Sequence, residues 1–238
     1  MINYTQRSYK KELLDRNDIP FVDIVKNMKE LDFINTYLGG HSITLAGFKK
    51  LLNTKKEIPV CEIGCGGGDN LKAIYNFCKK KKIKARLQGI DINPDCIAFA
   101  KKNSWIENVN FIVSDYRAIN FKEHKPGIIF SSLFCHHFTD DELVDMLRWM
   151  KHNATMGFFI NDLQRNPLAY NFIKAATGLF SKSYLVKNDA PLSVLKGFRK
   201  NEWQRIFERA GIHYYSIEWK WAFRYLIISP ATEGEKTG

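Results

Sequence analysis

Residues 59–70 of this chain, Pro59 to Asn70, read PVCEIGCGGGDN. The stretch begins as an apolar strand and then places four glycines among residues 64–68. Glycine loses more conformational freedom on folding than other residues, so such a cluster indicates a backbone that must approach something closely. A strand, a glycine turn and a helix form the first unit of a Rossmann-like fold, in which ligands bind beyond the carboxyl ends of the strands.

Strand-like and helix-like segments alternate around this stretch. Pro94 suits the first turn of a helix, and Thr139 and Glu142 have the spacing of a capping box. A helical pattern stops at Gly39-Gly40, as helices commonly do. The patterns predict strands at 58–64, 85–92, 108–115, 127–134, 157–162, 213–221 and 223–229, and helices at 21–38, 42–53, 70–82, 94–103, 139–151 and 201–211.

Strands that are separated by helices predict a parallel sheet with right-handed crossovers. Only a few residues join the last two strands, so we expect that pair to be antiparallel. The expected fold class is therefore α/β, with a Rossmann-like, doubly wound, seven-stranded and mostly parallel sheet whose last strand is antiparallel. A helical N-terminal extension and an inserted lid complete the expected fold.

Composition narrows the class of protein. The 238 residues are 45% hydrophobic and 26% charged, and no apolar run reaches the roughly 18 residues that a membrane span needs. The start, MINYTQRSYKKELL, lacks the apolar centre of a secretory signal, so we expect a cytoplasmic location. The five cysteines form no Cys-x-x-Cys pair, which argues against a zinc site and a disulfide framework, and we expect no metal.

The net charge of +11 is a feature that nucleic-acid-binding proteins share. Most of this charge comes from scattered lysines, and we expect the densest run, at 79–82, to form a solvated helix end. Nucleic acid is therefore disfavoured as a partner. We expect a small-molecule substrate and a monomer or homodimer.

The glycine loop differs from the dinucleotide fingerprint G-x-G-x-x-G. Asp69 stands where the third fingerprint glycine would pack helix against strand, and Glu62 lies inside the strand just before the turn. A carboxylate at that point would disfavour a pyrophosphate and favour a cation. An NAD-dependent oxidoreductase is therefore a weaker alternative.

With these features the sequence resembles class I S-adenosylmethionine (SAM)-dependent methyltransferases, of the small-molecule type related to ubiquinone and menaquinone biosynthesis methyltransferases. EIGCGGG at 62–68 is similar to that family's first motif, and GIDI at 89–92 to its second-strand motif. SDY at 114–116 is similar to the third motif, and SSLFCHHF at 131–138 to the segment after the fourth strand. The resemblance covers roughly residues 58–229. It implies SAM as cofactor and S-adenosylhomocysteine (SAH) as product.

The resemblance implies a role for each motif position. The glycines would let the backbone approach the cofactor, Asp91 would accept hydrogen bonds from the ribose hydroxyls, and Asp115 would accept one from the adenine amine. The Glu62 carboxylate would favour the cationic end of the cofactor electrostatically, either directly or through a water molecule. Asp91 and Asp115 could instead be helix-cap or turn residues. His41 could either be an exposed residue or lie near the methionine end of the cofactor. The implied cofactor contacts are Glu62, Gly64, Cys65, Gly66, Gly68, Asp91, Ile92, Asp115, Tyr116, Ser132 and His41.

Methyl transfer from a sulfonium is an in-line displacement, in which the protein aligns the acceptor and can remove a proton. His136 and His137 follow the fourth strand, where the family's substrate pocket begins, and imidazole suits base catalysis near neutral pH. A positioning or packing role for this pair stays open.

The insertion at 163–200 is the expected acceptor lid. Phe172 and Tyr184 could pack round a flat apolar substrate, and Arg165 and Arg199 could pair with a carboxylate or phenolate. The alternative is that these residues belong to plain surface helices. The resemblance implies a phenolic or quinone-like acceptor, with O-methylation in bacterial secondary or quinone metabolism.

Two other functions remain open. The positive charge would suit an RNA or protein methyltransferase, although SSLFCHH replaces the Asn/Asp-Pro-Pro-Tyr/Phe stretch usual in enzymes that methylate base amines. A non-catalytic SAM-binding protein could share the fold. We expect one domain composed of a helical cap at 1–57, a cofactor-binding core at 58–162, the lid at 163–200, a C-terminal helix and antiparallel strands at 201–230, and a disordered tail at 231–238.

Overall fold

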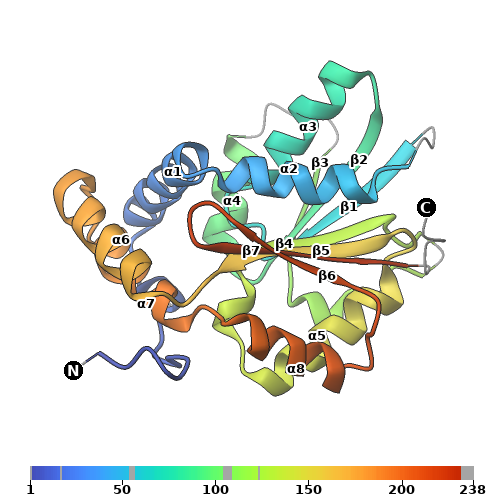
Figure 1. Ribbon diagram of the computed structural model, residues 1–238. Coiled ribbons are helices and arrows are strands. Elements are labelled where there is room, and N and C mark those ends of the chain that lie inside the picture. Colours follow the sequence, from blue (N-terminus) through green and yellow to red (C-terminus); the bar gives the residue numbers. More distant parts are fainter. Residues whose placement is uncertain (1, 17, 54–56, 104–108, 123, 232–238) are drawn as a thin grey trace.

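The computed structural model describes residues 2–16, 18–53, 57–103, 109–122 and 124–231. Of the tail expected at 231–238, only Ala231 falls within the described residues. A seven-stranded sheet runs through the centre of the molecule, with helices on both faces (Figure 1). Its strands are β1 (Glu57–Ile63), β2 (Lys84–Asp91), β3 (Val109–Val113), β4 (Ile128–Ser132), β5 (Gly157–Leu163), β6 (Ser216–Lys220) and β7 (Arg224–Pro230).

The strand order is β3-β2-β1-β4-β5-β7-β6. β1 is parallel to β2 and β4, whereas β7 is antiparallel to both of its neighbours, β5 and β6. Six strands of this sheet therefore run one way and β7 runs the other, which confirms the expected fold class. The chain changes direction across the sheet between β1 and β4, and this switch point is where open α/β sheets form a ligand crevice.

The described part of the chain forms eight α-helices. Gly39, with φ of +78°, turns the chain after the first helix, so the second begins at Gly40, earlier than predicted. Thr139 and Glu142 form the predicted capping box. The helices are α1 (Phe21–Tyr37), α2 (Gly40–Leu51), α3 (Asp69–Lys81), α4 (Pro94–Lys102), α5 (Asp140–Asn153), α6 (Pro167–Phe180), α7 (Tyr184–Lys196) and α8 (Lys200–Arg209).

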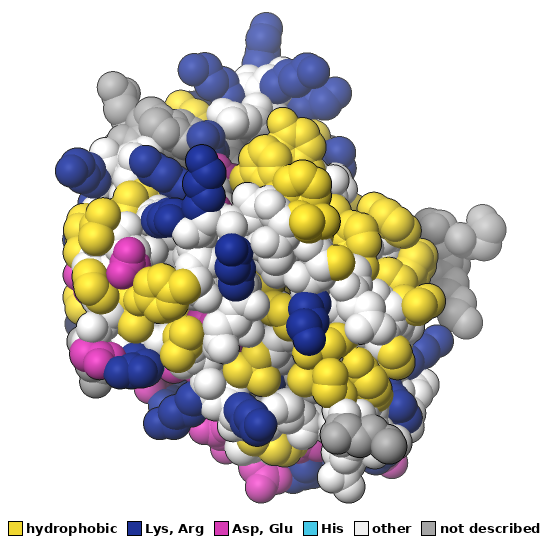
Figure 2. Space-filling view, turned by 90° about the vertical axis from the view of Figure 1, so that its left-hand side faces the viewer, with side chains coloured by type: hydrophobic (Ala, Val, Ile, Leu, Met, Phe, Trp, Pro, Cys, Tyr) yellow, Lys and Arg dark blue, Asp and Glu magenta, His cyan; other side chains and the backbone are white. Residues whose placement is uncertain are grey.

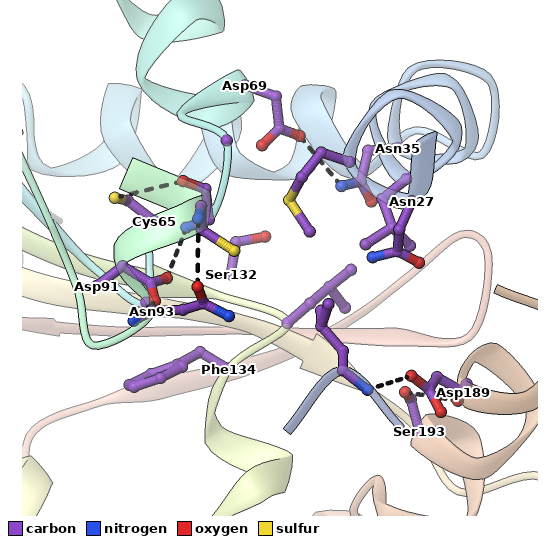
Figure 3. A pocket seen from close by; sticks show the side chains of 18 of the residues that line it. Asn27, Asn35, Cys65, Asp69, Asp91, Asn93, Ser132, Phe134, Asp189 and Ser193 are labelled. Carbon is purple, nitrogen blue, oxygen red and sulfur yellow. Dashed lines mark hydrogen bonds between the residues drawn. The ribbon is translucent and has the colours of Figure 1, made fainter. Parts of the chain in front are cut away.

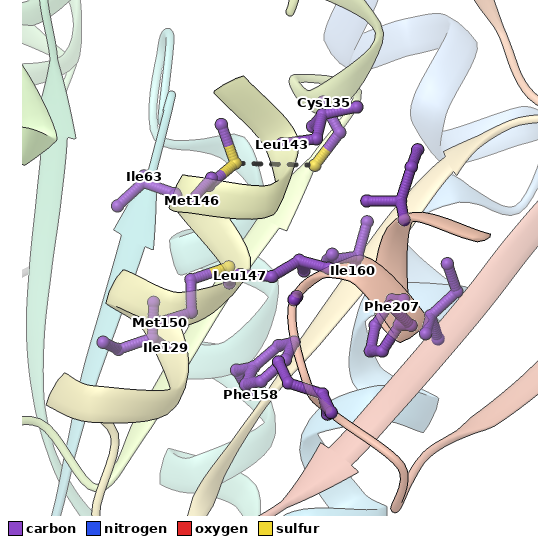
Figure 4. Close-up of a cluster of buried hydrophobic side chains, with 14 of the residues drawn as sticks. Ile63, Ile129, Cys135, Leu143, Met146, Leu147, Met150, Phe158, Ile160 and Phe207 are labelled. Carbon is purple, nitrogen blue, oxygen red and sulfur yellow. Dashed lines mark hydrogen bonds between the residues drawn. The ribbon is translucent and has the colours of Figure 1, made fainter. Parts of the chain in front are cut away.

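Alternate residues of the central strands supply the two layers of the core. Val60 and Phe130 belong to the layer that α2, α3 and α4 cover. Cys61 and Ile129 belong to the layer under α5 and α8. Figure 4 shows the second layer, where α5 supplies Leu143, Met146, Leu147 and Met150. Both faces of the sheet are buried in this way, as the apolar runs predicted.

The helices α1, α6 and α7 lie together beyond the carboxyl ends of the parallel strands (Figure 1). The N-terminal segment 2–16 is fastened to α7, because Leu13 and Leu14 donate backbone hydrogen bonds of 2.8 and 3.0 Å to the Asp189 carboxylate. These elements enclose one end of the sheet. Among the described helices, none has both the length and the apolar character needed to cross a membrane.

Candidate functional site: a cavity above the glycine loop

A cavity of about 980 Å³ lies between the glycine loop and the helices beyond the strand ends (Figure 3). Its volume lies at the upper end of the range usual for small-molecule sites. The sequence-predicted residues on its wall are Gly64, Cys65, Gly66, Gly68, Asp91, Ile92, Asp115, Tyr116, Ser132, His136, His137 and Phe172.

The glycine loop has three left-handed residues, with φ of +67° at Gly64, +48° at Gly66 and +77° at Gly68. A Cβ at Gly64 would lie 2.1 Å from the Phe134 ring, and one at Gly68 would lie 2.8 Å from the Phe111 ring. A Cβ at Gly66 would lie 3.6 Å from Met28 Sδ, which is an ordinary van der Waals contact. Gly64 and Gly68 thus make room for the protein's own rings, and all three glycines line the cavity.

Asp91 ends β2 and holds the loop in place. Its Oδ2 accepts a hydrogen bond of 2.8 Å from the Gly66 N–H, and its Oδ1 accepts one of 2.9 Å from the Asn93 N–H. Burial raises the pKa of this carboxyl. Because a carboxylate has about four acceptor positions, lone pairs remain for a ligand hydroxyl in the cavity. Asp91 thus combines the turn role with an unfilled capacity to accept hydrogen bonds.

Asp115 follows β3 and is already paired. Its Oδ1 accepts from the Arg117 N–H at 2.9 Å, and its Oδ2 accepts from the Arg117 Nε–H at 2.9 Å. This pairing lowers the pKa of Asp115. Neighbouring Tyr116 is buried and meets Phe134 and Trp149 edge to face. Asp115 therefore has the turn role that the sequence offered as an alternative. A ligand amine would have to share the Asp115 carboxylate with Arg117.

A buried polar network lies beneath the loop. Asn70 donates a hydrogen bond of 3.1 Å to Glu62 Oε1, and Asn161 donates to the hydroxyls of Thr44 and Ser132. Glu62 Oε2 and Asn161 Oδ1 are buried without a hydrogen-bond partner. Burial, followed by the nearby Asp69, raises the pKa of Glu62 well above its usual value, which favours a neutral carboxyl. Glu62 does not line the cavity, so it could act on a bound ligand only indirectly.

A second polar chain lies beside the loop. His41 Nε2 is 2.8 Å from Asp69 Oδ2, and Asn35 donates to the same oxygen at 3.2 Å. Arg224 donates to Asn35 Oδ1 at 3.0 Å, while its Nη1 is buried without a partner. Burial lowers the pKa of Arg224 to about 10. His41 does not line the cavity. It contacts the carboxylate of Asp69, and Asp69 does line the cavity.

Elsewhere on the cavity wall, His136 is buried between two carboxylates. Its Nδ1 is 2.8 Å from Asp162 Oδ1, and its Nε2 is 3.6 Å from Glu12 Oε1. Burial alone would lower the pKa of the imidazole, but Asp162 and Glu12 raise it to about 9. His136 is therefore protonated at neutral pH. A protonated imidazole can donate hydrogen bonds but cannot accept a proton, so His136 is not suited to act as the base.

His137 lies beside a lysine. Lys196 Nζ is 3.2 Å from His137 Nδ1 and 3.0 Å from Glu12 Oε1. Glu12, His136 and His137 have the residue types and the spacing of a metal site. The Lys196 ammonium, however, sits beside two of these groups and supplies the positive charge that a metal ion would bring. The cluster is thus a hydrogen-bonded ion network at the cavity wall.

Three residues expected to contact the substrate lie elsewhere. Arg165 is buried, and its guanidinium donates to Glu202 Oε1 and to the Gly197 carbonyl, both at 2.6 Å. Arg199 donates to a carbonyl of the N-terminal segment, and the Tyr184 hydroxyl donates to an aspartate of α1. None of these three lines the cavity, whereas Phe172 is on the wall.

Several residues of the cavity wall were not predicted from the sequence. Asn27 and Asn35 lie on the buried face of α1, and Asn27 points towards the cavity in Figure 3. The sequence did contain a signal for both asparagines, because each is a polar residue on the apolar face of a predicted helix. Glu12 and Arg224 carried no such signal, because distant segments bring them to the site.

Comparisons with known proteins agree with this geometry. Residues 60–157 match the family model described as a methyltransferase domain. No curated relative matches the sequence. Among solved structures, the plantazolicin methyltransferase BpumL in complex with SAH has a TM-score of 0.62 at 17% identity, over 88% of each chain.

Two further structures share the fold. A SAM-dependent methyltransferase from Aquifex aeolicus has a TM-score of 0.61 at 16% identity, over 90% of this chain and 100% of that one. Human N-acetylserotonin methyltransferase in complex with SAM has a TM-score of 0.59 at 16% identity, over 89% of this chain and 56% of that one. At such identities the likeness shows the fold. Residues 60–157 of this chain match the methyltransferase-domain family model, and the solved structures share the fold over most of the chain.

Proposed function

We propose that this chain is a SAM-dependent methyltransferase that methylates a small, flat aromatic acceptor, phenolic or quinone-like, on oxygen. The observation that carries the proposal is a cavity whose wall holds two chemically different groups of residues. The first group, the proposed cofactor end, has the glycine backbone and an aspartate with free acceptor positions. The second group, the proposed acceptor end, has an ion network with two histidines. A nucleoside-sized donor and an aromatic acceptor would use these two groups.

The cofactor end fits SAM on the chemistry of its side chains. Asp91 retains acceptor positions for the ribose hydroxyls, and the backbone at Gly66 can be approached. Arg224 and Asp69 place a guanidinium and a carboxylate at the wall, which suits a ligand carrying both a carboxylate and an ammonium. SAM, when bound, supplies an activated methyl group. The three structures compared above also include two with SAH or SAM bound.

The acceptor end suits a phenol. The protonated His136 lies on the cavity wall, where its positive charge can favour a phenolate oxygen, and Lys196, which is not a wall residue, donates to His137 Nδ1. His137 lines the cavity with an exposed fraction of 25% for its side chain, and it is the proposed proton acceptor. His136 becomes a positioning residue. Phe172 and Val186 contribute apolar wall against which a ring can pack.

Two measurements test this proposal. Calorimetric titration should show binding of SAM and SAH and no binding of NADH. Mass spectrometry after incubation with SAM and a panel of phenols and quinols should show one added methyl group on an oxygen. Absence of SAM binding would contradict the proposal outright. Tight SAM binding with no turnover on the panel would favour a non-catalytic SAM-binding protein, and salt-sensitive binding of bulk RNA would favour a nucleic-acid substrate.

A further inference from the structure

The helix α6 is apolar but lies mostly in solvent. Of its 14 residues, Ala169 and Thr177 are buried. Four large apolar side chains on it are exposed, with fractions of 69% for Leu168, 50% for Phe172, 78% for Leu179 and 82% for Phe180. Water-facing helices usually place such side chains against a core. This helix therefore presents an apolar surface that nothing in the described chain covers.

Three of the exposed side chains share one side of the helix. At about 100° per residue, Leu168, Phe172 and Leu179 fall within about 40° of one another, and Phe180 projects about 100° away from Leu179 at the C-terminal end of the helix. We call these four residues the α6 surface. Phe172 also lines the cavity, so the α6 surface reaches from the outside of the molecule to the cavity wall.

The sequence around the α6 surface is cationic: residues 166–188 include three lysines and no aspartate or glutamate. One carboxylate of α1 lies close by, because Glu30 accepts hydrogen bonds from Ser181 Oγ and from the Lys182 N–H. Lys174, Lys182 and Lys187 are all exposed. Figure 2 looks onto this side of the molecule: hydrophobic side chains gather on it with Lys and Arg among them, while Asp and Glu show mainly along the left and lower margins. Apolar side chains among lysines are complementary to a partner that has an apolar interior and negative charges on its surface.

We propose that the α6 surface docks on anionic lipid bilayers, with Leu179 and Phe180 in the interface and the lysines among the headgroups. A second copy of the chain would bring lysines against lysines, and RNA would gain little from four large apolar side chains. Because Phe172 belongs to both the surface and the cavity wall, an apolar acceptor could pass from the bilayer to the site; this last consequence rests on the proposed function.

Vesicle co-sedimentation tests the docking without cofactor or acceptor, so its result is independent of methyl transfer. The full chain is incubated with vesicles of phosphatidylcholine alone or with added phosphatidylglycerol, at low and physiological salt. We expect binding to the anionic vesicles that weakens with salt. The double variant Leu179→Ser with Phe180→Ser should bind at least about tenfold more weakly. Leu179→Ile with Phe180→Leu keeps the surface apolar and should bind like the wild type.

Charge reversal provides the second arm. Lys174→Glu with Lys182→Glu should weaken binding by about tenfold or more. The matched control, Lys80→Glu with Lys81→Glu, makes the same charge change at the far end of α3 and should have a much smaller effect. Failure of the wild type to bind anionic vesicles, or equal binding by the serine variant, would overturn the proposal. So would light scattering that shows a dimer which the serine variant breaks. Circular dichroism and SAM calorimetry confirm that each variant is folded.

Discussion

Replacing His136 with asparagine should change how the free energy of unfolding depends on pH. His136 is 3% exposed, and its Nδ1 lies 2.8 Å from Asp162 Oδ1. Burial by itself lowers the pKa of the imidazole, but the carboxylates of Asp162 and Glu12 raise it from 6.5 to about 9. The folded protein therefore keeps a proton on His136 in a pH range where the unfolded chain releases it.

Each pH unit in that range changes the free energy of unfolding by about 1.4 kcal/mol for one such proton. The stabilisation is fully present below pH 6.5 and is lost as the pH rises through about 9. The whole loss amounts to about 3 kcal/mol. Asparagine cannot hold the proton, so the stability advantage of the wild type over His136→Asn should shrink by that amount across the range.

Urea denaturation followed by tryptophan fluorescence, at steps from about pH 6 to about pH 10, measures this difference. His213→Asn is the matched control, because His213 is exposed and its loss should leave the pH dependence of the wild type unchanged. Groups that titrate identically in wild type and variant cancel in the comparison. Parallel curves for wild type and His136→Asn would refute the protonated state of His136, and with it the reason for excluding His136 as the base.

Three further predictions concern the cavity. Asp91→Ala should weaken SAM binding by about 1–3 kcal/mol in calorimetry, because both the loop contact and the hydroxyl acceptor are lost; unchanged affinity would remove Asp91 from the site. Arg224→Gln should weaken binding of SAM but not of adenosine, which lacks the amino-acid end, and an equal effect on both would contradict the assignment. His137→Ala should lower turnover about 10²–10⁴-fold at saturating SAM while leaving SAM affinity unchanged; full activity would mean that His137 is not the base.

The sheet could be predicted because its local patterns and its tertiary contacts agree. The strands have apolar residues on both faces, and the capping box at Thr139 specifies a helix start within four residues. The loop at 64–68 was recognisable for the same reason, since its backbone angles require glycine locally. What lies against each glycine was not predictable, because Phe111 lies in the middle of β3 and Phe134 follows β4, both far from the loop in sequence.

The ion network around His136 and His137 was predicted only in part. The histidines were found because they follow a strand directly, but their protonation depends on partners that sequence spacing does not show. Glu12 reaches Lys196 across 184 positions. Arg165 had the residue type of an anion-binding group, yet Glu202, 37 positions further on, already pairs with it. Residue type indicates what a side chain can do, whereas the tertiary fold decides which side chains remain available.

The distance along the chain between Glu12 and Lys196 also orders events during synthesis. The glycine loop and the β2 carboxylate that holds it come from residues up to Asp91, so a nascent chain carries both early. The ion network needs Lys196, and Arg224 follows later still. Until α7 has left the ribosome, Glu12 has no ammonium beside it and the acceptor compartment has no outer wall. A ribosome-stalled chain ending before α7 would therefore lack the compartment in which transfer is proposed to occur.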